Sequence, residues 1–167
     1  AWFTISPDTT APIIRLISPE NNSYRNENVT FYYNVTDPTS SVANCSLIIN
    51  GSVKNTTLNP PEDTILNFTY HGLGEGVYNW SVNCTDPDGN ENSSEIRRLN
   101  IDTTGPVAIL DRPQNDTVIN ALNDGYTYMV NASVSDSGVG NISSVTFMYR
   151  YNSSDTWKLI CRDEDGA

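Results

Sequence analysis

The chain has 167 residues, a formal net charge of −11 and only 37% hydrophobic residues. This charge argues against nucleic acid as a partner because its phosphates would be repelled, whereas cations, sugars and neutral surfaces are better partners. No apolar run approaches the roughly 20 residues that a membrane-spanning helix needs, so no span is expected in this segment.

Short segments rich in β-branched and aromatic residues predict seven β-strands in the first hundred residues. Four of them, 28–36, 43–50, 64–70 and 76–85, alternate between a hydrophobic and a polar face. The clearest is 76–85, where Tyr78, Trp80 and Cys84 alternate with polar residues before the turn residues Asp86-Pro-Asp-Gly-Asn90. The predicted strands are 12–18, 28–36, 43–50, 51–57, 64–70, 76–85 and 93–101.

Two near-identical phrases, Asp8-Thr-Thr-Ala-Pro12 and Asp102-Thr-Thr-Gly-Pro106, lie 94 residues apart, which is the length of one immunoglobulin-sized sandwich. Each phrase stands between two strand-like runs, so we interpret it as a linker between successive domains. We therefore expect a complete domain over 8–103 and a partial one over 104–167. Residues 1–7 are expected to be the last strand of a preceding domain or a donated strand. The chain does not begin with Met and shows no signal peptide, which indicates a mature piece or an excerpt.

The second unit begins with the same alternation but has only about four predicted strands. An open sheet of this kind would expose its core face and an unpaired edge. Either the sequence is cut, or another chain supplies the missing strands. The expected inward faces are Tyr126, Tyr128, Val130, Ala132 and Val134; Val145, Phe147, Tyr149 and Tyr151; and Trp157, Leu159 and Cys161.

Asparagine-linked glycosylation is predicted by an excess of Asn-x-Ser/Thr triplets. The chain has 21 Asn, of which 14 open such a triplet, whereas chance would give about four. Accidental triplets in an Asn- and Thr-rich β-protein are the alternative. In the alternating strands the acceptor lies on the polar face every time. Strand register and glycosylation therefore select the same surface, since a one-residue slip of register would bury the sugars. The acceptors are Asn21, Asn28, Asn34, Asn44, Asn50, Asn55, Asn67, Asn79, Asn83, Asn92, Asn115, Asn131, Asn141 and Asn152.

Cys45 and Cys84 both face inward in the first predicted domain, and we predict a disulfide between them. Closing a loop of this size would stabilise the domain by roughly 4 kcal/mol in the chain-entropy model. Two buried free thiols are the alternative; a metal site would lack His and further Cys nearby. Cys161 is left over, which suggests a partner in sequence beyond residue 167.

The phrases DTTAP, LGEGVYNWSVNCTDPDGN and DTTGP resemble the tandem immunoglobulin-like repeats of archaeal and bacterial cell-surface proteins. The match covers residues 8–106 and, in part, 107–161. The resemblance implies an all-β fold of tandem immunoglobulin-like antiparallel sandwiches, the second incomplete, outside the cell. Modules of this kind serve in stalks, adhesins, surface layers and filaments, or as spacers on secreted enzymes. The density of acceptors together with cysteines resembles archaeal surface glycoproteins more than bacterial ones.

A calcium site is one interpretation of Asp86, Asp88 and Asn90, which place oxygen ligands at alternating positions. A twelve-residue EF-hand loop would need Glu at its last position, where this chain has Arg97, so that fit fails. A plain hairpin turn is the alternative. Further aspartates near the predicted domain ends could share a cation that stiffens a linker: Asp8, Asp37, Asp102 and Asp136.

Catalysis is not expected. His71 is the only histidine, and no nucleophile elbow, phosphate loop or HExxH pattern is present. Glu75 with an Asp could be imagined as a glycosidase pair, but acidic β-proteins offer such pairs by chance. No cofactor is expected other than calcium.

Three functions remain open. The first is a non-enzymatic extracellular stalk, filament or surface-layer element made of glycosylated modules, with copies of itself or neighbouring domains as partners. A filament is favoured, in which residues 1–6 add a strand to a neighbouring subunit. The second is an adhesin or carbohydrate-binding module whose loops 86–92 and 136–141 use calcium. The third is a spacer of a larger secreted enzyme.

Overall fold

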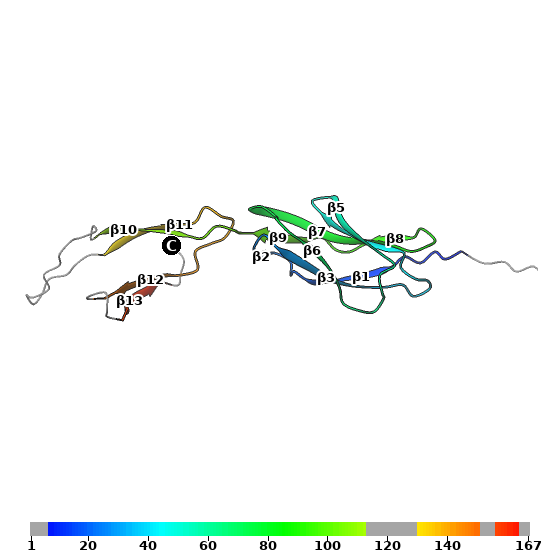
Figure 1. The fold of residues 1–167 in the computed structure, drawn as a ribbon, viewed down its shortest axis with the longest axis horizontal. Coiled ribbons are helices and arrows are strands. Elements are labelled where there is room, and N and C mark those ends of the chain that lie inside the picture. The colour runs from blue at the N-terminus through cyan, green and yellow to red at the C-terminus, as the bar shows by residue number, and fades with distance from the viewer. Residues whose placement is uncertain (1–6, 113–129, 151–155, 164–167) are drawn as a thin grey trace, which may run out of the picture. The chain divides into compact units, whose positions relative to one another are not determined.

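The computed structural model describes residues 7–112, 130–150 and 156–163. The chain divides into two units, residues 1–103 and 104–167. All regular elements in the described residues are strands (Figure 1). In the first unit they are β1 (Ile13–Ser18), β2 (Ser23–Arg25), β3 (Val29–Thr36), β4 (Asn44–Ile49), β5 (Ser52–Leu58), β6 (Leu66–Tyr70), β7 (Gly76–Thr85), β8 (Glu91–Ser93) and β9 (Arg97–Ile101). The second unit has β10 (Val107–Arg112), β11 (Asn131–Ser135), β12 (Val145–Tyr149) and β13 (Lys158–Asp163).

The first unit is built from two facing sheets. One has the order β1-β3-β6, and the other has the order β2-β9-β7-β4-β5, with β8 paired to the end of β7. The first strand of the domain is thereby divided, because β1 pairs antiparallel with β3 and β2 pairs parallel with β9 in the opposite sheet. This strand order is that of an immunoglobulin-type sandwich. The chain enters the unit beside β8 and leaves it beyond β9, at the opposite end (Figure 1).

The core of the first unit follows the alternation in the sequence. Phe31, Tyr33 and Val35 of β3 are fully buried, and so are Val82 and Cys84 of β7. The ring of Phe31 lies 4.9 Å from that of Trp80 between centroids, a tilted aromatic contact. Burial raises the pKa of Tyr33 to about 12. The predicted strand faces are therefore the ones that pack in the sandwich.

Two connections in the first unit have well-defined local chemistry. Asn50 and Gly51 join β4 to β5 with φ values of 49° and 74°, the conformation that Asn-Gly favours in a two-residue hairpin. Near the start of β7, the Tyr78 hydroxyl donates to the carbonyl of Gly74, four residues upstream, at 3.1 Å.

The predicted strand 93–101 is wrong as a single element. Glu91–Ser93 and Arg97–Ile101 both pair with β7, but the residues between them form a bulge. The bulge is held because the Ser94 N–H donates to the Val82 carbonyl and the Ser94 hydroxyl accepts from the Val82 N–H. A side chain replaces a backbone acceptor there, and the extra residue bends the strand.

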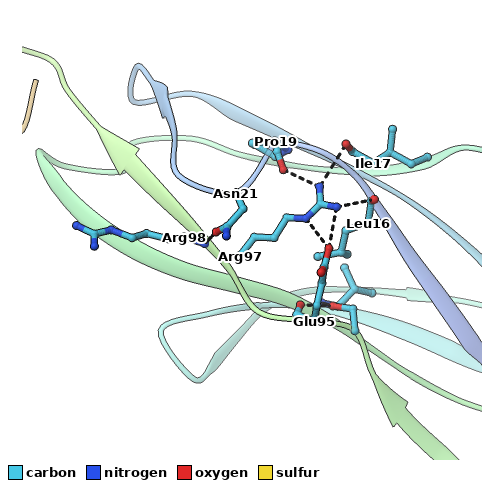
Figure 2. A network of polar contacts seen from close by, with 9 residues as sticks. Leu16, Ile17, Pro19, Asn21, Glu95, Arg97 and Arg98 are labelled. Atoms are coloured by element: carbon cyan, nitrogen blue, oxygen red, sulfur yellow. Dashed lines mark hydrogen bonds and ion pairs between the residues drawn. The ribbon is translucent and has the colours of Figure 1, made fainter.

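Arg97 ties the divided first strand to the opposite sheet (Figure 2). Its guanidinium donates to the carbonyls of Leu16, Ile17 and Pro19 at 3.0, 3.3 and 3.0 Å, and it forms an ion pair with Glu95 at 2.8 Å. These contacts engage all five of its N–H groups. They satisfy carbonyls that become free where the chain passes from one sheet to the other.

The described strands of the second unit form two separate two-stranded sheets, β10-β11 and β12-β13. Among the expected inward residues, Ala132, Val134, Val145 and Phe147 are half-buried. The others that the structure describes are exposed instead: Val130, Tyr149, Trp157, Leu159 and Cys161. The expectation that Leu159 and Cys161 share a face is also wrong, because a register shift sets them opposite Met148 and Phe147, which point to opposite sides of β12. Tyr126, Tyr128 and Tyr151 lie outside the described residues.

Candidate functional site

Three carboxylates meet at the end of the first unit where the chain enters. Ligand oxygens of Asp8, Asp86 and Asp88 all lie within 4.8 Å of one another. Asp8 belongs to the linker phrase, whereas Asp86 and Asp88 belong to the turn after β7. No Lys or Arg of the described residues forms an ion pair with any of the three.

The linker is shaped around the Asp8 carboxylate. It accepts hydrogen bonds from the Thr10 N–H at 2.9 Å and from the Thr10 hydroxyl at 2.6 Å. The Thr39 hydroxyl lies 2.9 and 2.8 Å from its two oxygens, and the hydroxyls of Thr10 and Thr39 also contact each other. These hydrogen bonds, first of all that from the Thr10 hydroxyl, hold the pKa of Asp8 well below its ordinary value. The Asp-Thr-Thr sequence thus keeps a charged carboxylate at the domain entrance.

Asp86, in the turn after β7, is buried and only 2% exposed. Its carboxylate accepts from the Asn90 N–H at 2.8 Å and from the Asn90 side-chain amide at 2.7 Å. Burial raises the pKa of Asp86, but the hydrogen bonds from Asn90, together with those from the Gly89 and Asp88 backbone, outweigh it and the net pKa is lowered. Gly89 adopts a φ of 89°, which L-residues rarely reach, and so lets the turn close.

Asn90 connects the turn to the linker. Its side-chain nitrogen donates to the Asp8 carbonyl at 3.0 Å as well as to Asp86. The sequence suggests Asn90 as an oxygen ligand of calcium. In the structure the side-chain nitrogen of Asn90 is instead a hydrogen-bond donor that joins Asp8 to Asp86. Asp88 is exposed beside them.

The Asp37 carboxylate shares the Thr39 hydroxyl with Asp8 but does not belong to the group of three. Its Oδ1 accepts from the N–H groups of Thr39 and Ser40 at 3.0 and 2.9 Å, and the Thr39 hydroxyl that contacts Asp8 is 3.3 Å away. Its Oδ2 is buried and has no hydrogen-bond partner in the described part of the chain. A buried carboxylate oxygen without a partner is costly unless a positive charge compensates it.

The other aspartates of the predicted cation site are not brought into this group. Asp102 lies in the outgoing linker, where its N–H donates to the Arg25 carbonyl. Asp136 follows β11 and accepts from the Gly138 N–H at 2.9 Å, much as Asp37 accepts from Thr39 two residues on. The arrangement at Asp8, Asp86 and Asp88 offers hard oxygen ligands at close range, the set that Ca²⁺ prefers.

The Cys45 and Cys84 sulfurs form a disulfide between directly opposed residues of β4 and β7. Both cysteines are fully buried. Cys161 is a free, exposed thiol on β13. The bond therefore joins neighbouring strands within one sheet.

The predicted glycan acceptors are all at least partly accessible where the structure describes them. Asn34, Asn44 and Asn83 are half-buried. The exposed acceptors are Asn21, Asn28, Asn50, Asn55, Asn67, Asn79, Asn92, Asn131 and Asn141, and Asn115 and Asn152 lie outside the described residues.

The polar residues considered for catalysis have structural partners. The His71 ring nitrogen lies 3.1 Å from the Asn28 side-chain oxygen. Glu75 accepts from the N–H and hydroxyl of Thr103 at 2.7 and 2.9 Å, which fastens the outgoing linker. A hollow of about 640 Å³ beside β1 is lined by residues that include Arg97, whose five N–H groups are already engaged.

Searches against family models and against curated proteins find no match. Solved structures with a similar arrangement include fibronectin(III)-like modules of CbhA from Clostridium thermocellum, with 18% identity over 55% of this chain and 47% of that chain and a TM-score of 0.47. A mutant of the SrpA adhesin from Streptococcus sanguinis matches with 23% identity over 56% of this chain and 58% of that chain, with a TM-score of 0.40. The chain thus spans about half the length of these structures. The immunoglobulin-type assignment depends on the strand order above.

In the described residues, no helix has the length and apolar character needed to cross a membrane.

Proposed function

We propose that this chain is a segment of an extracellular, non-enzymatic surface protein made of tandem immunoglobulin-like modules. The observation that carries the proposal is the first unit itself: a complete sandwich, entered and left at opposite ends, between two copies of the Asp-Thr-Thr-x-Pro phrase. Modules joined in this way form a stalk, a filament or a surface-layer element.

The chemistry of the surface supports this role. Acceptor asparagines line the outer sides of both sheets, as at Asn67 on β6 and Asn79 on β7, and N-linked glycans on these sides would face solvent. A buried disulfide favours an oxidising compartment outside the cytosol. The structural roles of His71 and Glu75 favour a mechanical function over a catalytic one.

Labelling of intact cells tests the proposal. Antibodies raised against residues 7–103 should bind non-permeabilised cells of the source organism, and brief protease treatment of those cells should remove the signal. Labelling that requires permeabilisation would reject a surface location.

A second function, favoured by the three carboxylates at the domain entrance, is calcium-dependent fixing of the linker. A divalent cation held by Asp8, Asp86 and Asp88 would neutralise their mutual repulsion and join residue 8 to the turn after β7. Such a module would be stiff with calcium and looser without it.

Thermal unfolding with CaCl₂ or with chelator tests the cation site. A free calcium concentration of about 100 times the Kd of the site would stabilise the folded state by about 2.7 kcal/mol. The Tm should therefore rise with calcium. Asp88→Asn, which alters an exposed ligand, should abolish the rise, whereas Asp63→Asn in an exposed loop should retain it. An unchanged Tm at millimolar calcium would reject the site and leave the surface-module proposal standing.

A further inference from the structure

The acceptor asparagines differ in what their amide nitrogens do in the folded module. N-linked glycan is attached through Nδ2, so a modified Asn gives up one of its two amide hydrogens. In Asn83 both hydrogens are in use: Nδ2 donates to Glu91 Oε1 at 2.6 Å and to Ser93 Oγ at 2.9 Å. These bonds join β7 to β8, and Asn83 is half-buried between them.

Asn79 provides the contrast on the same strand. It lies four residues before Asn83, on the same outer face of β7, and it is exposed. Its backbone N–H donates to the Asn50 side-chain oxygen, but its own Nδ2 has no hydrogen-bond partner in the described part of the chain. A glycan can therefore replace a hydrogen of Asn79 without breaking a contact.

Two acceptors on the outermost strands resemble Asn79. Asn55 lies on β5 and Asn67 on β6, the last strands of their sheets, and both are exposed. The Asn55 side chain accepts from the Thr56 N–H through its oxygen, which leaves the nitrogen available. Asn67 lies opposite Tyr32 on the outer face of its sheet.

Two further acceptors are intermediate. The Asn34 nitrogen donates once, to the Thr64 carbonyl, and the Asn92 nitrogen donates once, to the Pro12 carbonyl. One amide hydrogen of Asn34 and one of Asn92 remain free. A glycan could therefore be attached to either nitrogen while its hydrogen bond is kept. Asn83 is therefore the sharpest case.

We propose that the folded module is glycosylated selectively, so that Asn55, Asn67 and Asn79 carry glycan while Asn83 remains unmodified. This inference rests on the proposed extracellular glycoprotein function. Modification of Asn83 requires breaking its hydrogen bond to the Glu91 carboxylate or to the Ser93 hydroxyl, which lowers the population of molecules that can react at Asn83 relative to Asn79.

Site-resolved mass spectrometry of glycopeptides from the whole chain, made in a host that performs N-glycosylation, tests the inference. Occupancy at Asn83 should be roughly tenfold lower than at Asn79, or lower still, because breaking a charge-assisted hydrogen bond reduces the reactive population by about that factor. Equal occupancy of Asn83 and Asn79 would overturn selectivity while leaving the glycoprotein proposal intact. Glycan at none of the acceptors would overturn both.

Variants that release the Asn83 amide give a second readout. Glu91→Ala combined with Ser93→Ala should raise Asn83 occupancy to the level of Asn79, and Ser93→Ala alone should raise it partly. Ser93 is the middle residue of the Asn92 triplet, so both acceptor motifs survive. Glu27→Ala, at an exposed turn, is the matched control and should leave Asn83 unmodified. Retention of the Cys45–Cys84 disulfide identifies folded molecules, and unchanged Asn83 occupancy in those molecules would overturn the inference.

Discussion

The two units of this chain use similar strand sequences with different results. In the first, β3 alternates buried and partly or fully exposed residues because a second sheet covers its inner face. In the second, the alternating strand β11 only half-buries Ala132 and Val134, and every residue of β10 is exposed, including Val107, Ile109 and Leu110. The described strands there form two-stranded sheets, which are marginal on their own. Alternation provides an apolar face, but only a facing sheet turns that face into a core.

Removing one aromatic ring from each unit should give the largest contrast. Trp80→Ala deletes a ring that is 1% exposed and packs on Phe31, and should cost about 3–5 kcal/mol. Trp157→Ala deletes a ring that is 56% exposed and lies 4.7 Å from the Arg150 guanidinium, and should cost only about 0.5–1 kcal/mol. Denaturant unfolding of the whole chain measures both. Similar losses at the two sites would mean that Trp157 is also in a core.

The cysteines allow a second comparison between the two units, because the first has a buried disulfide and the second has an exposed thiol. Replacing Cys45 and Cys84 together by Ala should lower the free energy of unfolding by about 4 kcal/mol, since the bond closes a long loop of the unfolded chain. Cys161→Ser removes an exposed thiol and should leave the unfolding midpoint unchanged under non-reducing conditions. A midpoint that is insensitive to loss of Cys45 and Cys84 would contradict a stabilising role for the disulfide.

One side chain, Arg97, holds the divided first strand of the first unit against the opposite sheet, and its removal tests that role. Arg97→Ala leaves the carbonyls of Leu16, Ile17 and Pro19 without their donor, and should cost about 2–3 kcal/mol. The neighbouring Arg98 is exposed, and its side chain points away from this cluster (Figure 2). Arg98→Ala is therefore the matched control, with an expected change within about 0.5 kcal/mol. Equal effects in urea unfolding would show that the carbonyl contacts contribute little.

The smallest expected effect is the acid dependence at the entrance of the first unit. Hydrogen bonds, mainly from Thr10, lower the pKa of Asp8 in the folded state. Its stabilising contribution is therefore present above the unfolded pKa of about 4 and is lost as the pH falls toward the folded pKa. Asp8→Asn should destabilise the chain at neutral pH, and the difference from wild type should shrink in acid.

Unfolding midpoints in urea at about pH 7 and about pH 3 measure this loss. Asp63→Asn, in an exposed loop with a φ of 55° that Asn tolerates, is the control. A difference between wild type and Asp8→Asn that stays constant with pH would contradict the role of the Asp8 charge.

The fold of the first unit was largely predictable from local pattern. The strands from β3 to β7 lie within a few residues of their predicted ranges, because period-two alternation is a property of neighbouring residues. The short strand β2 was not predicted, since three residues show no period. Its signal was indirect: a proline follows β1 and interrupts the first strand. The bulge at Ser94 was also missed, because it depends on what lies across the ladder.

The candidate site was predictable only in part. Asp86, Asp88 and Asn90 were identified from their spacing, and Asp8 only as one of several aspartates near domain ends. Their meeting within 4.8 Å depends on how the linker returns to a turn almost eighty residues away. The role of Asn90 as a donor depends on the same approach.

The sequence by itself determined which side of the alternating strands in the first unit faces the core, where the linker phrases lie and which asparagines are potential acceptors. These properties depend on residues that are adjacent along the chain. Only the tertiary structure decided which carboxylates meet, how Arg97 joins the two sheets and why Asn83 differs from Asn79. Those contacts depend on the register between distant strands and on the distance between two packed sheets, which local alternation does not specify.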